Sequence, residues 1–228
     1  MSNDSIILFG SAARGETTAE SDIDILVVSR DFSHPKSQHM GRIEIQTNSR
    51  SSMMDKSRSG DLFAIHIAFE GVPISDSNNF LTKFREELTI KECYAAERQV
   101  AFALSVYLLK VHSSSSDTIR ARRLAWCVRT ILISNLVEQG RFVFSPKGLA
   151  EAFPEFDVTS LLSLRRNSKG TEVDRLSGMM EKLLQNFGAS CYLEMELPAL
   201  RKEILGLGPT TASSTMRAIE GVSPSKDY

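Results

Sequence analysis

The sequence has few cysteines and no long apolar run. Three cysteines, Cys93, Cys127 and Cys191, are too few and too far apart for a disulfide framework or a zinc site, so we expect small buried residues in a reducing compartment. No stretch reaches the roughly 20 apolar residues of a membrane span, and the first residues lack the features of a signal peptide. The sequence therefore predicts a cytoplasmic protein without a membrane partner.

An excess of charge of one sign is lacking as well. The formal net charge is −1 at pH 7, and the four histidines show no metal-ligand spacing. Proteins that hold a nucleic-acid backbone are usually strongly basic, so nucleic acid is not expected as a partner. The 228 residues, 42% of them hydrophobic, can form one large globular domain or two small ones.

Two short segments near the N-terminus carry polar groups beside apolar strands. Gly10 directly follows the apolar residues 6–9. Asp22 lies just before the apolar segment 23–28, and Asp24 lies within it. Because alternate side chains of a strand leave the same face, Asp22 and Asp24 point to one side. Two adjacent like charges need a cation, and Mg²⁺ prefers a few carboxylates together with water and phosphate oxygens. The spacing predicts a magnesium site.

Gly10 and Ser11 have the properties of a phosphate-binding turn. Good helix formers follow them, so we expect Ser11 to be the N-cap of a helix. A helix N-terminus offers free N–H groups to an anion, and Gly10 has no Cβ to keep a phosphate away. Ser11 could add a hydroxyl donor and Arg14 a charged one. A triphosphate held here would share oxygens with a metal on the aspartates, as phosphoryl or nucleotidyl transfer requires.

These motifs resemble the signature of the DNA polymerase β-type nucleotidyltransferase superfamily. The resemblance rests on Gly10-Ser11, Arg14-Gly15 and Ser21-Asp22-Ile23-Asp24 before an apolar strand, and it is greatest to the minimal and kanamycin-type enzymes. It implies two Mg²⁺ ions and a nucleoside triphosphate substrate, with ATP expected. It also implies metal-binding and catalytic roles for Asp22 and Asp24. The nucleotide contacts that it implies are Gly10, Ser11, Arg14 and Ser21.

The resemblance requires a third carboxylate on a neighbouring strand, and Glu44 is the best candidate. Ile43 and Ile45 mark the face that we expect to be buried, and Glu44 lies on the opposite one. A strand paired beside residues 23–28 would bring Glu44 to the metal as a ligand, as the base for the acceptor proton, or as both. Family members usually have Asp here, and an ordinary outward-facing Glu is the alternative. Asp76 and Asp61 are the next candidates.

The hydrophobic pattern predicts an α+β fold in two domains. Strands are expected at 6–9, 23–29, 42–47 and 72–75, with helices after Ser11 and around 61–69. The later helices are expected at 84–111, 118–139, 145–153, 157–166, 171–188 and 193–205. Residues 1–83 are expected to form a polymerase β-type mixed sheet flanked by helices. Residues 84–207 would form an all-α helical bundle, and 208–228 a flexible tail.

The bundle is expected to bind the acceptor or a partner protein, as the resemblance implies. Its cations Arg120, Arg122, Arg123 and Lys147 could reach the phosphates, or they could form a solvated helix face. Trp126, Phe142 and Phe144 are expected to pack in the core or between domains rather than to stack on a base. The Arg and His pair of helical HEPN ribonucleases has no counterpart in the sequence.

The sequence thus predicts a nucleotidyltransferase that moves a nucleoside monophosphate to a hydroxyl acceptor. The acceptor would be a small aminoglycoside-like molecule or a protein, such as a partner toxin silenced by AMPylation. The alternative is a regulatory or antitoxin-type protein of the same fold that acts by protein–protein interaction with little turnover. The retained pair Asp22 and Asp24 favours the enzyme, because a dead site has no reason to keep repelling carboxylates. A homodimer is compatible with either.

Overall fold

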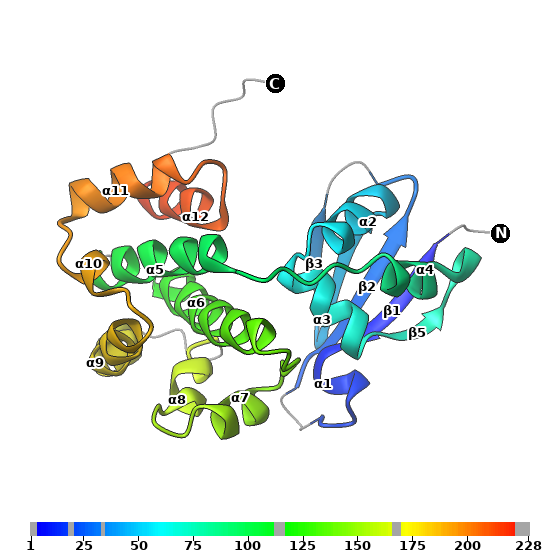
Figure 1. Ribbon diagram of the computed structural model, residues 1–228, viewed down its shortest axis with the longest axis horizontal. Helices are drawn as coiled ribbons and strands as arrows, with labels where there is room; N and C mark the ends of the chain where they lie inside the picture. Colours follow the sequence, from blue (N-terminus) through cyan, green and yellow to red (C-terminus); the bar gives the residue numbers. More distant parts are fainter. Residues whose placement is uncertain (1–3, 18–20, 33–34, 112–116, 166–169, 222–228) are drawn as a thin grey trace. The chain divides into compact units, whose positions relative to one another are not determined.

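The chain divides into two compact units in the computed structural model. It describes residues 4–17, 21–32, 35–111, 117–165 and 170–221 (Figure 1). Unit 1 comprises Met1–Glu92 and Gly140–Ser145, and unit 2 comprises Cys93–Gln139 and Pro146–Tyr228. The sequence places the boundary after residue 83. The structure places it nine residues later, after Glu92. It also assigns Gly140–Ser145, a short segment between two helices of the bundle, to unit 1, because this segment and residues 84–92 pack there.

Unit 1 contains a five-stranded mixed sheet in the order β3-β4-β2-β1-β5. The strands are β1 Ser5–Phe9, β2 Ile23–Ser29, β3 Lys36–Met40, β4 Ile43–Ser49 and β5 Val72–Ser75. β2 and β4 are parallel, and the other neighbours are antiparallel. Four of these strands match the predicted runs to within two residues. β3 was not predicted, because its residues are mostly polar and every one of them is exposed, which leaves no alternation to detect.

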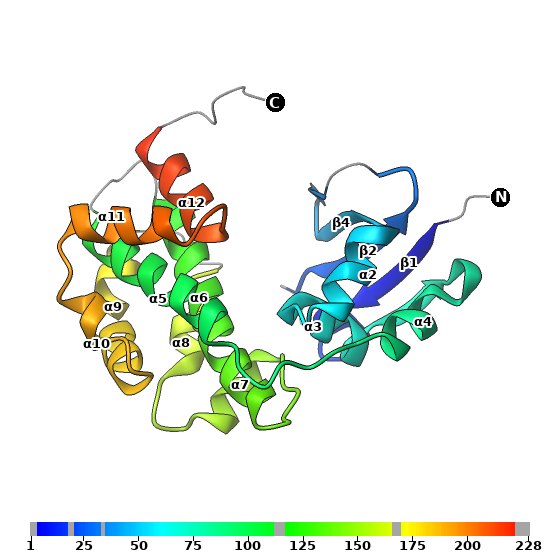
Figure 2. The same ribbon diagram turned by 45° about the horizontal axis from the view of Figure 1, so that its top comes forward.

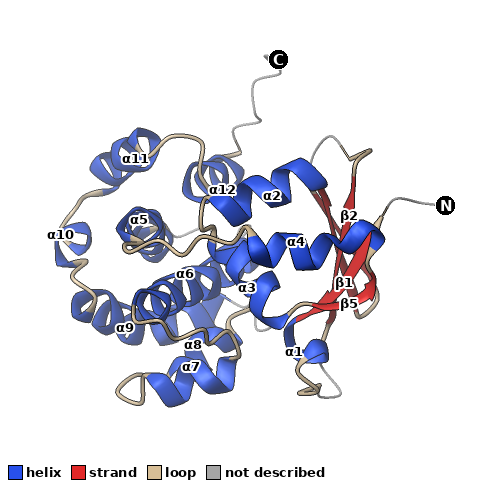
Figure 3. Ribbon diagram, turned by 45° about the vertical axis from the view of Figure 1, so that its right-hand side comes forward, coloured by secondary structure: helices blue, strands red, loops and turns tan. Residues whose placement is uncertain are grey.

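Three helices cover one face of this sheet (Figure 3). They are α2 Arg50–Arg58, α3 Leu62–Glu70 and α4 Phe80–Glu86, the last preceded by the short 3₁₀ helix η1 Ser77–Asn79. Asp61 caps α3 by accepting the N–H groups of Phe63 and Ala64, which explains why the predicted helix around 61–69 begins there. The core joins strand and helix residues, namely Ile7, Phe9, Leu26, Val28, Met53, Ala64, Ile67, Phe80 and Phe84.

The covered face of the sheet is the one that carries the carboxylates. Leu26 and Val28 are 0% and 2% exposed, and Asp24 shares their face because it differs from them by an even number of residues. Ile43 and Ile45 lie on the opposite face and are only half-buried. The prediction that they mark the buried face is therefore wrong. On β4 the helix-covered face carries Glu44, Gln46 and Asn48, so the alternation of its isoleucines does not identify the face that the helices cover.

Unit 2 consists of helices packed around α5 Ala95–Lys110 and α6 Asp117–Glu138 (Figure 2). The others are α7 Pro146–Ala152, α8 Val158–Ser163, α9 Gly170–Asn186, α10 Ser190–Leu193, α11 Leu197–Gly206 and α12 Thr211–Glu220. The helices predicted at 118–139, 145–153, 157–166 and 171–188 are confirmed to within three residues at each end. The structure thus has the predicted α+β class, with a mixed sheet followed by a helical part.

Two predicted helices have different bounds in the structure. The expected helix at 84–111 is wrong, since α4 ends at Glu86 and α5 begins at Ala95. Between them, the N–H of Thr89 donates to the carbonyl of Ser57, and the N–H of Tyr94 donates to Glu138, so tertiary partners replace intrahelical ones. The expected helix at 193–205 corresponds to α11, which begins four residues later than predicted because α10 ends at Leu193. Pro198 stands in the first turn of α11, where its missing N–H costs little.

The C-terminal segment is helical where a flexible tail was expected. α12 is closed at its start by a capping box of Thr210 and Ser213. At its end, a carboxylate oxygen of Glu220 accepts hydrogen bonds from the Tyr107 hydroxyl at 2.8 Å and from Arg201 Nε at 2.7 Å. The prediction of a tail followed from the many Ser and Thr residues of this segment. The helix α12 nevertheless has an apolar face, on which Met216 is only 4% exposed. Residues 222–228 lie outside the described part of the tail.

The cysteines differ in burial. Cys127 is buried as expected, but Cys93, in the segment before α5, and Cys191, in the short helix α10, are exposed. Among the residues that the structure describes, no helix has the length and apolarity to cross a membrane.

Candidate active site

Two carboxylates lie in register at the N-terminal ends of two neighbouring parallel strands, and a third acidic residue precedes one of these strands. The register of β2 and β4 pairs Asp24 with Glu44, and Asp22 lies just before β2. Adjacent strands lie about 4.8 Å apart, so Asp24 and Glu44 project from one face side by side. The predicted pairing of the Glu44 strand with residues 23–28 is thus present. Asp22, Asp24 and Glu44 are all half-buried, which leaves them accessible beyond the edge of the helical layer.

Gly10 closes this site from the β1 side. Its φ is +70°, and a Cβ at this position would lie 2.5 Å from Oδ2 of Asp24. β1 places Phe9 opposite Asp24 in the antiparallel register, which brings the following glycine against the carboxylate. No other residue type satisfies both the backbone angle and this close approach.

The turn after Gly10 differs from the predicted cap. α1 Gly10–Ala13 begins at Gly10, so Phe9 occupies the N-cap position and Ser11 lies inside the turn. The prediction of Ser11 as N-cap is wrong, because the positive φ of Gly10 starts the turn one residue earlier. The Ser11 carbonyl accepts the N–H of Glu16 at 2.9 Å, so the loop folds back compactly. Its hydroxyl makes no hydrogen bond to residues in the described part of the chain.

Arg14 belongs to a network of charged groups that the sequence did not reveal. Its Nε contacts Glu16 at 2.7 Å, and its Nη1 contacts Glu70 of α3. The same oxygen of Glu70 lies 2.8 Å from Nε2 of His66. The side chains of Arg14, Glu70 and His66 are only 19%, 12% and 14% exposed. In the sequence, only the four-residue spacing of His66 and Glu70 on a predicted helix indicated a contact within this network. The contact of Arg14 with Glu70 could not be predicted, because 56 residues separate the two.

The electrostatics of this network keep Glu70 ionised. Burial would raise the pKa of Glu70, but the hydrogen bond and charge of His66, together with the charge of Arg14, outweigh it and lower the pKa below its ordinary value of 4.5. The ionised Glu70 anchors Arg14 and with it the turn after Gly10. This arrangement favours a positioning task for Arg14, while its predicted contact with the nucleotide stays a prediction.

Aromatic rings hold His66 from two sides. The His66 ring stacks on Phe144, with centroids 4.6 Å apart and planes at 16°, and it meets Phe9 edge-on at 5.6 Å. Nearby, Phe142 stacks on Phe69 at 3.9 Å. Phe144 is 1% exposed. Phe142 and Phe144 therefore pack within unit 1, as the sequence predicts, rather than present a platform to a base.

Ser21 lies at the start of β2 with its backbone fixed. Its carbonyl accepts hydrogen bonds from Arg42 Nη2 at 2.7 Å and Nε at 3.2 Å, and the Arg42 carbonyl accepts the N–H of Ile23 at 2.7 Å. These bonds set the position of the two aspartates. Ser21 is 4% exposed, and its predicted contact with the nucleotide stays a prediction.

The alternative third acids have structural partners elsewhere. Asp61 caps α3, and Asp76 accepts the N–H of Leu81 at 3.2 Å and the hydroxyl of Ser5 at 3.3 Å. Glu44 instead lies in register with Asp24. Its Oε1 accepts hydrogen bonds from Ser37 at 3.3 Å and Gln46 at 3.5 Å, and these neutral donors orient the carboxylate.

The bundle cations do not form one cluster. Arg120 is 3% exposed and bonds the Leu108 carbonyl and Asp117, so it belongs to the interior of unit 2. Arg122 is exposed, and the side chain of Lys147 is 82% exposed and 3.9 Å from Glu151. A role of Arg120 at the phosphates conflicts with this burial.

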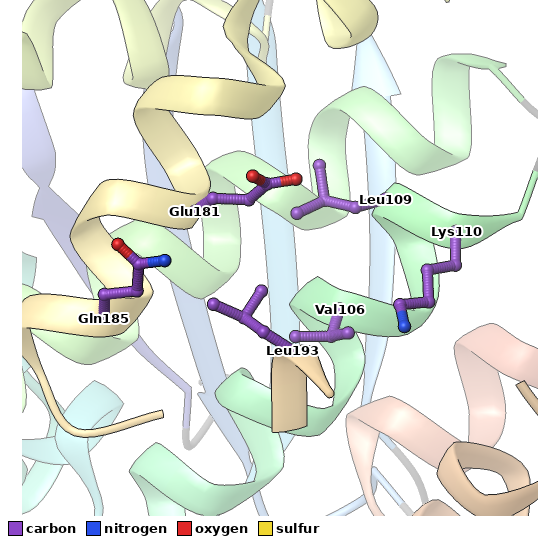
Figure 4. A pocket seen from close by; sticks show the side chains of 6 residues that line it. All are labelled: Val106, Leu109, Lys110, Glu181, Gln185 and Leu193. Carbon is purple, nitrogen blue, oxygen red and sulfur yellow. The ribbon is translucent and has the colours of Figure 1, made fainter. Parts of the chain in front are cut away.

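A cavity between helices of unit 2 is small for an acceptor site. It measures about 210 Å³ and lies between α5, α9 and α10 (Figure 4). Lys110 at its rim donates to the carbonyl of Met195 at 2.6 Å. Ligand pockets are usually larger, from roughly 300 Å³ upward. Its principal polar group is already engaged within the unit.

The carboxylates fit a magnesium ion that arrives with its substrate. In the described ranges, no three His, Cys, Asp or Glu side chains stand close enough to hold a metal by themselves. Mg²⁺ is usually held by one or two carboxylates together with substrate phosphates and water. Asp22 and Asp24 would supply such a pair, and the Asp24 carboxylate packs directly against Gly10, where the turn after β1 begins.

Comparison with known proteins supports this reading of unit 1. The family model of the nucleotidyltransferase domain matches residues 2–72, which include the turn after Gly10, both aspartates and Glu44. The chain is also similar to the crystal structure of a nucleotidyltransferase-like protein from Exiguobacterium sibiricum 255-15. Identity is 17%, the TM-score is 0.33, and the match covers 96% of this chain and 82% of the other, a likeness too weak to build on. No curated protein sequence matches the chain.

Proposed function

We propose that the nucleotidyltransferase domain of residues 2–72 transfers a nucleoside monophosphate from a nucleoside triphosphate to a hydroxyl acceptor. The in-register pair of Asp24 and Glu44 carries this proposal, because it places an acid from each of two parallel strands beside Asp22. Two carboxylates can hold a metal while a third remains for the acceptor proton.

The triphosphate would bind where β1 ends. The backbone N–H groups of the turn after Gly10 and the hydroxyl of Ser11 would bind the β and γ phosphates. Arg14, anchored by Glu70, would keep this turn in place. Mg²⁺ held by Asp22 and Asp24, with Glu44 as a further ligand, would neutralise charge on the phosphate oxygens and orient the leaving group.

The reaction would be an in-line displacement at the α-phosphorus. The acceptor oxygen forms a bond to this phosphorus while the bond to the bridging oxygen breaks, and pyrophosphate leaves with the electron pair. The carboxylate of Glu44 takes the proton of the acceptor hydroxyl. Its bonds from Ser37 and Gln46 orient it for this step.

We keep both acceptor classes in this proposal, a small hydroxylated molecule and a protein. ATP is the expected triphosphate. The family model ends at residue 72, so the acceptor contacts in unit 2 lie outside it. A regulatory protein of this fold that binds without turnover is the competing function.

The test is a transfer assay with the full chain, Mg²⁺ and each nucleoside triphosphate. Triphosphate labelled at the α position is incubated with small-molecule and protein fractions of a lysate, and pyrophosphate release is measured in parallel. We expect α-label on an acceptor, and loss of transfer in Asp24→Asn and in the presence of EDTA. Transfer of γ-label instead would indicate a kinase. Nucleotide binding without label transfer to any fraction would favour the regulatory protein.

A further inference from the structure

A second polar concavity lies in unit 1, away from the carboxylates. This basic hollow has a volume of about 620 Å³, and its lining includes Arg30, Arg50, Ser51, Arg58, Asn78 and Lys83. Arg30 directly follows β2, Arg50 begins α2 after β4, and Lys83 lies on α4. Asp24 and Arg30 stand near opposite ends of β2, and six residues of strand span about 20 Å. The basic hollow is therefore separate from the candidate active site.

The basic hollow carries an excess of positive charge. Its lining has four cations and two carboxylates, Asp55 and Glu87. Both carboxylates pair with Arg58, at 3.3 Å and 2.6 Å. Arg30, Arg50 and Lys83 pair with no carboxylate in the described part of the chain. Three uncompensated cations in one concavity repel each other, and a bound anion would relieve this repulsion.

Arg50, one of the residues that line the basic hollow, is held in place by an aromatic ring. Its guanidinium lies over the ring of Phe80, 5.1 Å from the centroid, and the Phe80 side chain is fully buried. α2 and α4 are joined beside it, since the Ser57 hydroxyl donates to the Phe84 carbonyl at 2.7 Å. The cations thus project from a rigid frame. No aromatic ring belongs to the described lining, so the hollow offers no stacking surface for a base.

We propose that the basic hollow binds a compact polyphosphate group, either free or as the phosphate end of a nucleotide. Cations from three separate elements converge on one concavity, which fits several negative charges close together. An extended nucleic-acid backbone would need a stripe of cations instead. This site does not depend on the proposed transfer reaction, and recognition rests on phosphate charge alone.

The test is a calorimetric titration of the full chain with sodium tripolyphosphate in EDTA, which removes any contribution from a metal-dependent site. The test variant is Arg30→Gln with Lys83→Gln, because both side chains are exposed and their loss leaves the core intact. The matched control is Lys182→Gln with Lys202→Gln, which removes two exposed charges from unit 2. We expect at least tenfold weaker binding in the test variant and unchanged binding in the control. ATP is expected to bind about as tightly as tripolyphosphate, which would identify the phosphates as the recognised group.

Several outcomes would overturn the proposal. Equal affinity in the test variant and the unmodified protein would place the anion elsewhere, and absence of binding heat with either phosphate would remove the site. If an oligothymidylate bound more tightly than tripolyphosphate, and this binding were lost in the same variant, the ligand of the basic hollow would be an extended nucleic-acid backbone and not a compact polyphosphate. Binding that requires Mg²⁺ and disappears in Asp24→Asn would assign the anion to the candidate active site.

Discussion

Gly10 lies directly against the carboxylate of Asp24, so that an added Cβ would come within 2.5 Å of Oδ2. Gly15, at the other end of the same turn, shares the φ of +70°, but a Cβ there would meet no atom within 4 Å. A comparison of substitutions at the two glycines therefore distinguishes the effect of backbone strain from the effect of contact with Asp24.

We expect Gly10→Ala and Gly15→Ala to lose similar stability, about 1–2 kcal/mol for a left-handed alanine. Only Gly10→Ala should lose transfer activity, on the order of 100-fold, because its methyl group displaces the Asp24 carboxylate. Urea unfolding and the α-label assay measure the two effects. Equal activity of the two variants would mean that the close approach at Gly10 has no part in catalysis.

Asp22→Asn and Asp24→Asn should each abolish transfer and leave the protein folded. Asparagine keeps the shape of the side chain and removes the charge that holds the metal, and loss of one of two repelling carboxylates does not weaken the metal-free fold. Turnover and thermal unfolding check these expectations. Full activity in both variants would contradict the metal site.

Glu44→Gln should lower the transfer rate by at least about 100-fold, the contribution of a positioned general base. Asp61→Ala is the control, since it removes the N-cap of α3 and should lower the stability of the protein without lowering the transfer rate. Single-turnover rates at saturating Mg²⁺ distinguish the two. A near-normal rate in Glu44→Gln would assign the third role to another group.

Glu70→Gln should destabilise the protein in a pH-dependent way. The pKa of Glu70 is lowered in the folded state, so its ion pairs contribute stability above pH 4.5, and this contribution is lost as the pH falls through the folded value. The difference in unfolding free energy between Glu70→Gln and the unmodified protein should therefore be largest near neutral pH and shrink below pH 4.5.

The matched control for Glu70 is Glu16→Gln, whose carboxylate also pairs with Arg14 but is 48% exposed. It should change stability by less than about 1 kcal/mol at any pH, as exposed pairs do. Urea unfolding at several pH values measures both variants. A constant deficit of Glu70→Gln across this range would show that the ion pairs do not stabilise the fold.

Tyr107→Phe should cost about 1 kcal/mol of stability, because it removes the hydroxyl that donates to Glu220 and ties α12 to α5. Tyr192→Phe is the control, since its hydroxyl bonds no residue in the described ranges. Thermal unfolding of both variants is the measurement. Equal melting temperatures of the two would mean that the hydrogen bond from Tyr107 to Glu220 does not stabilise the fold.

Short-range patterns were sufficient for four of the five strands and for the position of the two aspartates at the start of β2. Alternation sets which side chains share a face, and it depends only on the local backbone, so Asp22 and Asp24 could be paired from their spacing. The turn after Gly10 was located in the same way, although its start lies one residue earlier than predicted. The strand that contains Glu44 was recognised from its isoleucines, but the face that the helices cover was assigned incorrectly.

The sequence by itself determined four of the five strands, the turn after Gly10 and the spacing of the two aspartates, because each is encoded within a few residues. Only the tertiary structure decided which sheet face is covered, that Arg14 pairs with Glu70, and that α12 packs on α5. It also brought Arg30, Arg50 and Lys83 to one concavity. These contacts join residues that are distant in the chain, and their formation depends on how complete elements pack, which no local periodicity specifies.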